Sequence, residues 1–310
     1  MKLVFMGTPD FAVFSLRALI EAGHEITAVI TQPDKPRGRG YTLTPPPVKV
    51  AAIEAGIPVY QPTTLKDEAF DARLRQLSPE VIVVVAYGKI LPESVIRLPA
   101  LGCINVHGSL LPEYRGAAPM QRAIIDGKAV TGITTMYMDV GLDTGDMLLK
   151  EEIAIEENDN FETIHDKLGA LGASLIVRTL DALASESAPR IPQDHALATY
   201  AAKITKEDCL LNFDTDAKSV HDRIRGLSPI PLSFTHTADG KLLKITESRL
   251  TDTETAHDTP GEVLSLEGGI TVACRNGSVL LTGVLPEGKS RMAATDFIRG
   301  RKVNVGDLLK

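Results

Sequence analysis

One run of residues in this chain fits only the interior of a sheet. Five branched apolar residues and an alanine follow one another at Val81–Ala86. A strand that is apolar at every position is typical of a central strand buried on both faces, and such strands belong to parallel sheets covered by helices. The run therefore predicts an α/β architecture built around this segment.

Further strands and helices are expected to alternate along the first half of the chain. Apolar runs typical of strands are followed by segments that are apolar at helical spacing. This alternation predicts a doubly wound, mostly parallel, Rossmann-like sheet. The expected strands are Lys2–Met6, Glu25–Thr31, Val81–Ala86, Leu101–His107, Thr131–Asp139 and Met147–Ile155, and the expected helices are Phe11–Glu21, Pro47–Ala55, Asp67–Gln76, Ala118–Ile125 and Phe161–Leu183.

The pattern changes after a stretch rich in Ser, Pro and Ala. Short β runs follow, separated by turn signals such as Asp239-Gly240 and Asn276-Gly277. These runs predict a smaller C-terminal β-barrel, OB-like in its proportions. We expect a first domain over 1–186, a linker over 187–205 and the barrel over 206–310. Its expected elements are helices Ala217–Arg225 and Ala294–Arg299 and strands Pro231–His236, Lys241–Leu250, Gly261–Leu266, Ile270–Cys274 and Ser278–Val284.

Composition excludes several classes of protein. The net charge of −7 argues against a general nucleic-acid binder, although basic residues cluster between Lys289 and Lys302. Three widely spaced cysteines indicate neither a disulfide framework nor a zinc site, and Cys103 is expected to be a small buried residue rather than a nucleophile. With no secretory or membrane-spanning run, we expect a cytoplasmic protein with no membrane partner. No heptad or exposed apolar stripe indicates self-association, so we expect a monomer.

Common cofactor and nucleophile motifs are absent. Gly7-Thr8-Pro9-Asp10 follows the first strand but lacks the Gly-x-Gly-x-x-Gly spacing of dinucleotide sites. The chain has no phosphate-loop sequence, no Gly-x-Ser-x-Gly elbow and no His-Glu-x-x-His metal motif. The polar residues at the expected strand ends therefore become the candidates for chemistry. Gly7, Tyr87-Gly88 and Asn105/His107 all lie at such ends, which should converge on one crevice.

Asn105 and His107 form the most informative pair. Because side chains alternate along a strand, these two project from one face while Ile104 and Val106 project from the other. An amide and an imidazole can each offer an N–H donor to a developing oxyanion. Satisfied loop residues are the alternative interpretation of either residue taken alone.

Asp143 is the third candidate, in a turn flanked by Gly141 and Gly145. A carboxylate near an imidazole fixes its tautomer and favours its protonated form. A protonated His107 and the Asn105 amide would then stabilise a tetrahedral oxyanion, while Asp143, directly or through water, accepts the proton lost by an attacking amine. This set is typical of acyl transfer to an amine without a covalent enzyme intermediate. Asp139 and Asp146 are equally eligible on spacing alone.

Two long motifs resemble the 10-formyltetrahydrofolate-dependent formyltransferases. The first is Asn105–Pro112 followed by Tyr114–Pro119, and the second is Met138–Met147. The extension of the first motif through Gln121 is similar to the branch that acts on methionyl-tRNA. So are Phe5–Phe11, Gln32–Val48 and Leu285–Gly300. The resemblance thus covers nearly the whole chain.

This resemblance implies transfer of a formyl group from 10-formyltetrahydrofolate to the amino group of methionine on initiator methionyl-tRNA. It implies that Asn105, His107 and Asp143 are the catalytic set, and since the sequence contains no metal-ligand motif, no metal is expected. The folate co-substrate would contact two loops, whose residues are Val85, Ala86, Tyr87, Gly88, Ser109, Leu110, Leu111 and Pro112.

The resemblance also implies two regions that contact tRNA. The Pro33–Arg39 loop would close over the acceptor end through Lys35, Arg37 and Arg39, in contacts suited to phosphate rather than to bases. The C-terminal barrel would help to hold the tRNA through Lys289, Arg291, Arg299, Arg301 and Lys302. One departure is that Leu227–Pro231 replaces the aromatic-bearing Asn-Pro-Trp-Pro-like stretch of the family, so any stacking contact there is in question.

Other functions stay open at this point. The same chemistry could use glycinamide ribonucleotide or an amino sugar as acceptor, although such small acceptors need no second β-rich domain. The same three residues could hydrolyse the formyl cofactor with water as the nucleophile. An oxidoreductase and a non-catalytic tRNA-binding module are the remaining alternatives.

Overall fold

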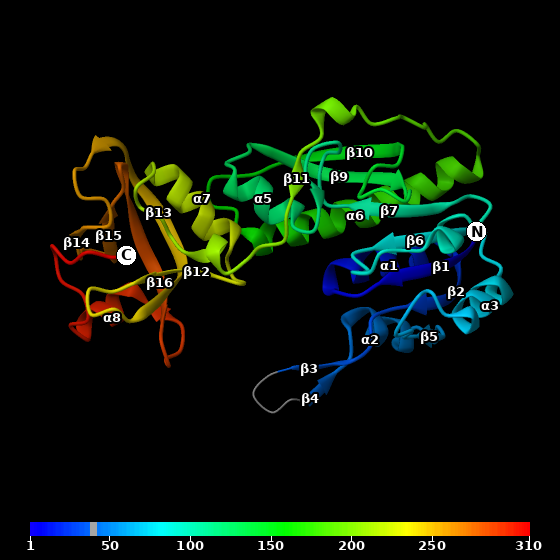
Figure 1. Cartoon of the computed structure of the whole chain (residues 1–310), viewed down its shortest axis with the longest axis horizontal. Helices are drawn as coiled ribbons and strands as arrows, with labels where there is room; N and C mark the ends of the chain where they lie inside the picture. The colour runs from blue at the N-terminus through cyan, green and yellow to red at the C-terminus, as the bar shows by residue number, and fades with distance from the viewer. Residues whose placement is uncertain (38–41) are drawn as a thin grey trace. The chain divides into compact units, whose positions relative to one another are not determined.

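The computed structural model describes residues 1–37 and 42–310, and Figure 1 labels most of its elements. The chain divides into two compact units that interleave in the sequence. The first comprises Met1–Gly116, Gly132–Ile153 and His165–Tyr200. The second comprises Ala117–Thr131, Ala154–Ile164 and Ala201–Lys310.

A seven-stranded sheet in the order β10-β9-β7-β6-β1-β2-β5 forms the core of the first unit. Five neighbouring strands are parallel, and β9 runs antiparallel to β7. Every residue of β6 is buried, so the predicted central strand and the mostly parallel, doubly wound sheet are confirmed. The strands are β1 (Lys2–Gly7), β2 (Glu25–Ile30), β5 (Val59–Tyr60), β6 (Val81–Val85), β7 (Cys103–His107), β9 (Val130–Tyr137) and β10 (Met147–Ala154).

Helices cover both faces of this sheet. On one face, Phe70 and Leu74 of α3 pack in a buried cluster with alternate residues of β1 and β6. On the other face, a Cβ at Gly172 of α6 would lie only 3.0 Å from Val106 of β7, so glycine permits the close approach of helix and sheet. The helices are α1 (Asp10–Glu21), α2 (Pro47–Glu54), α3 (Glu68–Leu77), α4 (Glu93–Ile96) and α6 (Phe161–Ala184).

The second unit contains an antiparallel sheet in the order β12-β13-β16-β15-β14, with β17 paired to β16. The last residues of the chain join its two edges. The Val263 N–H of β14 donates to the Asp307 carbonyl at 2.9 Å, and His236 of β12 exchanges backbone hydrogen bonds with Lys310 at 2.7 and 3.0 Å. The predicted C-terminal barrel is therefore closed by these residues.

The remaining elements belong to this unit or to the segments that connect the two units. Strands β12 (Ser233–His236), β13 (Leu242–Ala256), β14 (Val263–Ser265), β15 (Ile270–Ala273), β16 (Asn276–Pro286) and β17 (Met292–Ala293) build the barrel. Its core also takes in apolar residues of α7 (Ala217–Gly226) and α8 (Ala294–Arg299). The others are β8 (Arg115–Gly116), α5 (Pro119–Ile125), η1 (His195–Leu197), β11 (Tyr200–Ala201) and η2 (Glu207–Cys209).

Several element boundaries shift by one or two residues, and two segments differ more from their predictions. The Pro33–Arg39 segment is not a simple loop, because Lys35–Arg37 forms β3 and pairs antiparallel with β4 (Thr42–Thr44). Strand β13 continues to Ala256 rather than ending at Leu250, since its polar, exposed extension is held by backbone pairing with β16. Among the residues that the structure describes, no helix is both long and apolar enough to cross a membrane.

Candidate active site

Three strands of the first unit end side by side at one edge of the sheet. The register pairs Gly7 of β1 with Val85 of β6, and Val84 of β6 with Asn105 of β7. Strand β1 has β2 on one side and β6 on the other, so the connections diverge at this place. Open α/β sheets bind ligands at such switch points. The strand ends therefore lie together, as the sequence predicts.

The loop after β6 offers backbone groups rather than side chains. Ala86 and Gly88 are exposed and have positive φ angles of 46° and 82°. The Tyr87 ring is buried in the core, and this burial raises the pKa of its hydroxyl to about 12. Its carbonyl accepts hydrogen bonds from Thr8 Oγ1 at 2.9 Å and Gln32 Nε2 at 3.1 Å. Val85 is buried as well, so its side chain is not accessible to a ligand. The predicted folate contacts at this loop are therefore expected to use exposed main-chain N–H and C=O groups. Such groups can form hydrogen bonds with the edge of a flat heterocycle.

His107 is fixed in its tautomer by the chain that follows it. The imidazole is 6% exposed, and its Nε2 lies 2.9 Å from the Tyr114 carbonyl. A carbonyl only accepts, so Nε2 carries a hydrogen and Nδ1 is the atom left for chemistry. The half-buried Asn105 projects from the same face of β7, and its amide makes no hydrogen bond with any residue that the structure describes.

Asp143 reaches His107 from the loop between β9 and β10. Its Oδ2 lies 3.8 Å from His107 Nδ1 and accepts the Gly116 N–H at 2.8 Å. The structure thus brings together the three side chains proposed from the sequence. The segment Tyr114–Gly116 contacts both catalytic candidates, because it gives a carbonyl to His107 and an N–H to Asp143.

The second predicted folate loop divides into supporting and accessible residues. Ser109 is buried, and its hydroxyl donates to the Glu113 carbonyl at 2.7 Å. Leu111 is buried against Met136 and Met147. Leu110 and Pro112 are half-buried and remain the side chains that a ligand can reach.

A polar network ties the base of the β3–β4 hairpin to this edge of the sheet. Lys49 Nζ donates to both carboxylate oxygens of Asp34 at 2.8 Å and to Gln61 Oε1 at 2.8 Å. Gln61 Nε2 donates in turn to Asp34 and to the Gln32 carbonyl. These bonds from Gln61 and Lys49 lower the pKa of Asp34. Because Gln32 also bonds Tyr87, the network links the hairpin to the loop after β6.

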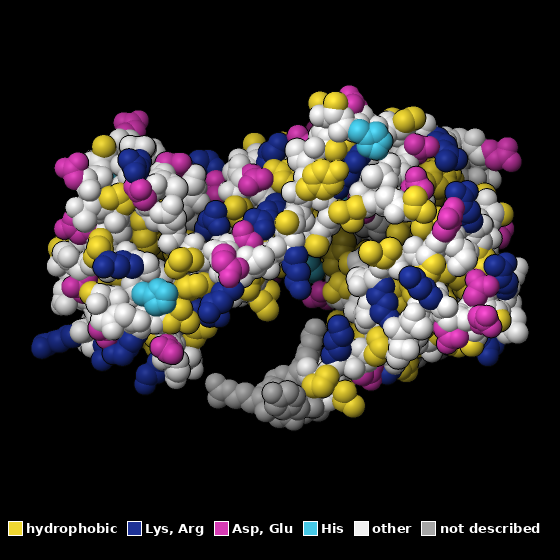
Figure 2. Space-filling view, viewed as in Figure 1, with side chains coloured by type: hydrophobic (Ala, Val, Ile, Leu, Met, Phe, Trp, Pro, Cys, Tyr) yellow, Lys and Arg dark blue, Asp and Glu magenta, His cyan; other side chains and the backbone are white. Residues whose placement is uncertain are grey.

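The predicted tRNA-contacting cations lie in two places. Lys35 is exposed on β3, Arg37 ends that strand, and Arg39 lies outside the described residues. All five cations of the C-terminal set are exposed. Lys and Arg side chains gather over the part of the second unit that carries α8, at the lower left of Figure 2. Arg299 donates to Asp296 at 2.6 Å, and Arg291 lies 3.9 Å from Glu247.

The environment of the cysteines agrees with the sequence prediction that Cys103 is a small buried residue. All three are buried, and burial raises the pKa of the Cys103 and Cys274 thiols to about 12. A thiol in that state supplies almost no thiolate at neutral pH. No group of His, Cys, Asp and Glu among the described residues has the arrangement needed to hold a metal ion.

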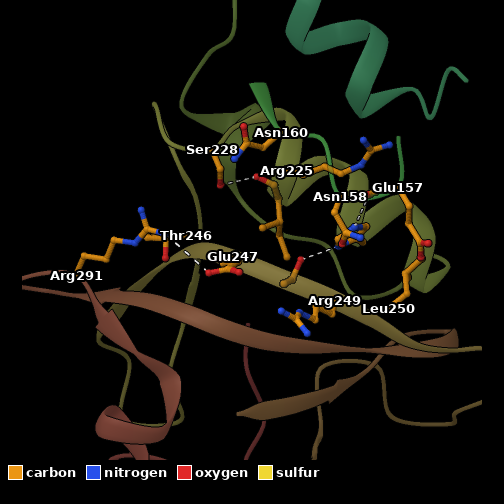
Figure 3. A pocket seen from close by; sticks show the side chains of 13 residues that line it. Glu157, Asn158, Asn160, Arg225, Ser228, Thr246, Glu247, Arg249, Leu250 and Arg291 are labelled. Atoms are coloured by element: carbon orange, nitrogen blue, oxygen red, sulfur yellow. Dashed lines mark hydrogen bonds and ion pairs between the residues drawn. The ribbon is translucent and has the colours of Figure 1, made fainter. Parts of the chain in front are cut away.

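The second unit contains a separate cavity of about 710 Å³. Figure 3 shows its lining, which mixes acidic, amide and basic side chains from α7, β13 and the segment 157–160. His221 lies in its wall, where Nδ1 accepts from Ser248 Oγ at 2.9 Å and Nε2 donates to the Glu157 carbonyl at 3.2 Å. Burial lowers the pKa of His221.

The buried, neutral His221 should make the protein sensitive to acid. Because its folded-state pKa lies below the unfolded value, its contribution to stability is present above the unfolded pKa and is lost as the pH falls toward the folded one. We expect His221→Gln to lose less stability than the parent between pH 7.5 and pH 5.5. Urea unfolding at both pH values measures this. His24, whose pKa burial also lowers, stays in both proteins, and an equal acid loss in both would contradict the prediction.

Two polar residues that support the site were not predicted from the sequence pattern. Arg115 is 2% exposed and Gln193 is 6% exposed, and they bond one another beneath the Asp143 loop. Arg115 belongs to a motif shared with the formyltransferase family, and Gln193 lies in the expected linker. The only local indication of a role for Gln193 is that a Gln occurs within a stretch of Ser, Pro and Ala. This pattern does not predict which residues Gln193 contacts.

Both halves of the chain match family descriptions. Residues 1–180 match "Formyl transferase", and residues 203–302 match "Formyl transferase, C-terminal domain". A protein named "Methionyl-tRNA formyltransferase" from Desulforamulus reducens is 49% identical over 310 residues, covering 100% of this chain and 98% of the relative. Another of that name from Pelotomaculum thermopropionicum is 50% identical, with coverage of 100% and 98%.

Solved structures share the fold at low identity. An N-formyltransferase from Helicobacter canadensis, in complex with folinic acid and dTDP-3-aminofucose, has a TM-score of 0.69 at 17% identity. The match covers 91% of this chain and 98% of that one. HypX from Aquifex aeolicus, in complex with tetrahydrofolic acid, has a TM-score of 0.65 at 16% identity, with coverage of 96% and 47%.

Proposed function

The chain belongs to the formyl transferase family, and we propose that its three converging side chains carry out formyl transfer at the edge of the first sheet. The protein transfers a formyl group from 10-formyltetrahydrofolate to the amino group of methionine on initiator methionyl-tRNA. The observation that carries the assignment of the site is the 3.8 Å approach of Asp143 to a His107 whose tautomer is already fixed.

The reaction needs one nucleophile, one oxyanion and one proton acceptor. The methionine amine attacks the formyl carbon, a C–N bond forms, and the carbonyl oxygen becomes an oxyanion. Protonated His107, through Nδ1–H, and the Asn105 amide donate hydrogen bonds to that oxygen, each at about 2.7–4 kcal/mol of transition-state stabilisation. The intermediate collapses as the bond from carbon to N10 of the folate breaks.

Asp143 accounts for the protons. Its carboxylate takes the proton that the attacking amine loses and passes it to N10 of the departing tetrahydrofolate, which regenerates the carboxylate. The hydrogen bond from the Gly116 N–H to Oδ2 holds the carboxylate in place beside His107. With the amine proton removed, the product amide nitrogen is uncharged and the transfer is complete.

The other predicted residues bind the two substrates. The exposed backbone at Ala86 and Gly88, with Leu110 and Pro112, forms the folate cradle. Lys35, Arg37 and Arg39 contact the acceptor end of the tRNA, and the cations between Lys289 and Lys302 contact its backbone. In this proposal residues 1–186 carry catalysis, 187–205 connect, and the barrel over 206–310 binds tRNA. The enzyme acts in the cytoplasm as a monomer.

An acceptor comparison tests the function directly. Purified protein with 10-formyltetrahydrofolate should formylate initiator methionyl-tRNA, and free methionine and glycinamide ribonucleotide should be poor acceptors. Because the barrel supplies contacts that a small acceptor cannot use, we expect kcat/KM for the tRNA to exceed the others by about 10³ or more. Faster transfer to glycinamide ribonucleotide would overturn the assignment, and formyl release without any amine would indicate a hydrolase.

The network at the hairpin base should affect tRNA use in particular. Lys49→Met removes the charged donor that joins Asp34 and Gln61, so the hairpin carrying Lys35 and Arg37 loses its anchor. We expect KM for tRNA to rise by about 5–10-fold, as for the loss of one or two charge-assisted contacts, while KM for the folate changes less. Steady-state kinetics measure both values. Lys66→Met, an exposed lysine on the same unit, is the matched control.

A further inference from the structure

Gln193 is held in one orientation by four hydrogen bonds. Its Oε1 accepts from Arg115 Nε at 3.0 Å and Nη2 at 2.7 Å. Its Nε2 donates to the Asp143 carbonyl at 2.8 Å and the Gly145 carbonyl at 2.7 Å. Arginine can only donate and carbonyls can only accept, so the amide cannot be flipped.

The loop that Gln193 holds needs external support. Asp143 has a φ angle of 51°, a left-handed conformation that costs a residue with a Cβ about 1 kcal/mol or more. A Cβ at Gly145 would lie 1.9 Å from the Tyr137 carbonyl oxygen, so the loop is pressed against β9. The two carbonyls that Gln193 binds flank the turn that aims the Asp143 carboxylate.

The other end of the network leads to His107. Arg115 is 2% exposed, and its guanidinium bonds neutral groups, Gln193 Oε1 and His195 Nδ1. The residues on either side of Arg115 in the chain are the ones that orient the catalytic pair, Tyr114 by its carbonyl and Gly116 by its N–H. Gln193 therefore links two backbone segments through hydrogen bonds: the segment around Arg115, which orients His107, and the loop that carries Asp143.

From this geometry we propose that Gln193 is a positioning residue that sets the distance between Asp143 Oδ2 and His107 Nδ1 for formyl transfer. It touches neither substrate and acts through Asp143. The inference rests on the proposed function of the site. It adds a residue from the segment 185–199, which the family resemblance and the sequence pattern left without a role in catalysis.

Gln193→Glu separates the two sets of hydrogen bonds that Gln193 makes. The new carboxylate still accepts from Arg115, but it cannot donate to the carbonyls of Asp143 and Gly145. Since a displacement of about 1 Å at a catalytic group can cost about 10²-fold, we expect kcat for methionyl-tRNA to fall 10–100-fold. Both KM values should stay within about two-fold, because neither substrate touches Gln193. Gln76→Glu, an exposed position on α3, is the matched control and should retain full kcat.

A double-mutant cycle distinguishes positioning from general support of the fold. In the Asp143→Asn background, Gln193→Glu should cost nothing further, because the group it positions is already gone. An undiminished kcat in Gln193→Glu, or an equal loss in both backgrounds, overturns the inference. Gln193→Met removes the same donors without adding charge. It is measured instead if Gln193→Glu does not fold. If neither folds, Gln193 is purely structural and the inference fails. Inactive parent protein would instead refute the proposed function.

Discussion

Asp143→Asn should lower kcat for formyl transfer by about 10³-fold, within the 10²–10⁴ range of general acid–base groups. The amide has nearly the shape of the carboxylate, so it can keep a contact with the Gly116 N–H through its carbonyl oxygen. It cannot take a proton from the attacking amine, and it places no negative charge 3.8 Å from His107 Nδ1. Folate binding should change little, since the cradle lies on other loops.

The measurement is single-turnover formylation of methionyl-tRNA, with folate affinity and thermal unfolding measured in parallel. His107→Ala is expected to behave in the same way, with a loss of about 10²–10³-fold for the missing oxyanion donor. Asp139→Asn is a matched control on the same loop, because Asp139 is the alternative carboxylate that spacing alone allowed. Retention of near-normal transfer by Asp143→Asn, or a larger loss in Asp139→Asn, would remove Asp143 from the mechanism.

The buried architecture was predictable because its signals are local. Each residue of Val81–Ala86 is apolar, so the pattern itself indicates a strand covered on both faces, and β6 is buried throughout. Asn105 and His107 share a face because a strand has only two. Asp143 stood out because glycines flank it, although Asp139 and Asp146 matched as well until the fold brought Asp143 to within 3.8 Å of His107.

Features that depend on distant contacts were not predictable from local pattern. Gln193 lies in a segment with no apolar periodicity, and its partners are 78 and 50 residues away along the chain. The same limit applies to the two predicted folate loops, where the sequence names Tyr87, Ser109 and Leu111 but does not show that their side chains face the core. Only the packing shows that these three side chains are buried. The polar end of β13 was missed because pairing with β16, not composition, makes it a strand.

Neutralising three cations of the C-terminal set should weaken tRNA binding and flatten its salt dependence. The variant is Lys289→Gln, Arg301→Gln and Lys302→Gln, all at exposed positions. Each phosphate contact on a duplex contributes about −0.9 to the slope of log K against log salt, so three lost contacts should make the slope shallower by about 2.7. At 0.15 M salt the same counterion release corresponds to an affinity loss of about 10². Binding of labelled tRNA over a salt series measures both effects.

The structure also predicts that the five cations of the C-terminal set contribute unequally to tRNA binding. Arg299 is already paired with Asp296 at 2.6 Å, so part of its charge is neutralised before tRNA arrives. Arg299→Gln should therefore change the slope less than Arg301→Gln does, although both remove one positive charge. A control variant with Lys66→Gln, Arg73→Gln and Arg97→Gln makes the same change in net charge on the first unit. If the control flattened the slope as much as the C-terminal variant, overall charge rather than this surface would account for binding, and the barrel would lose its assigned role.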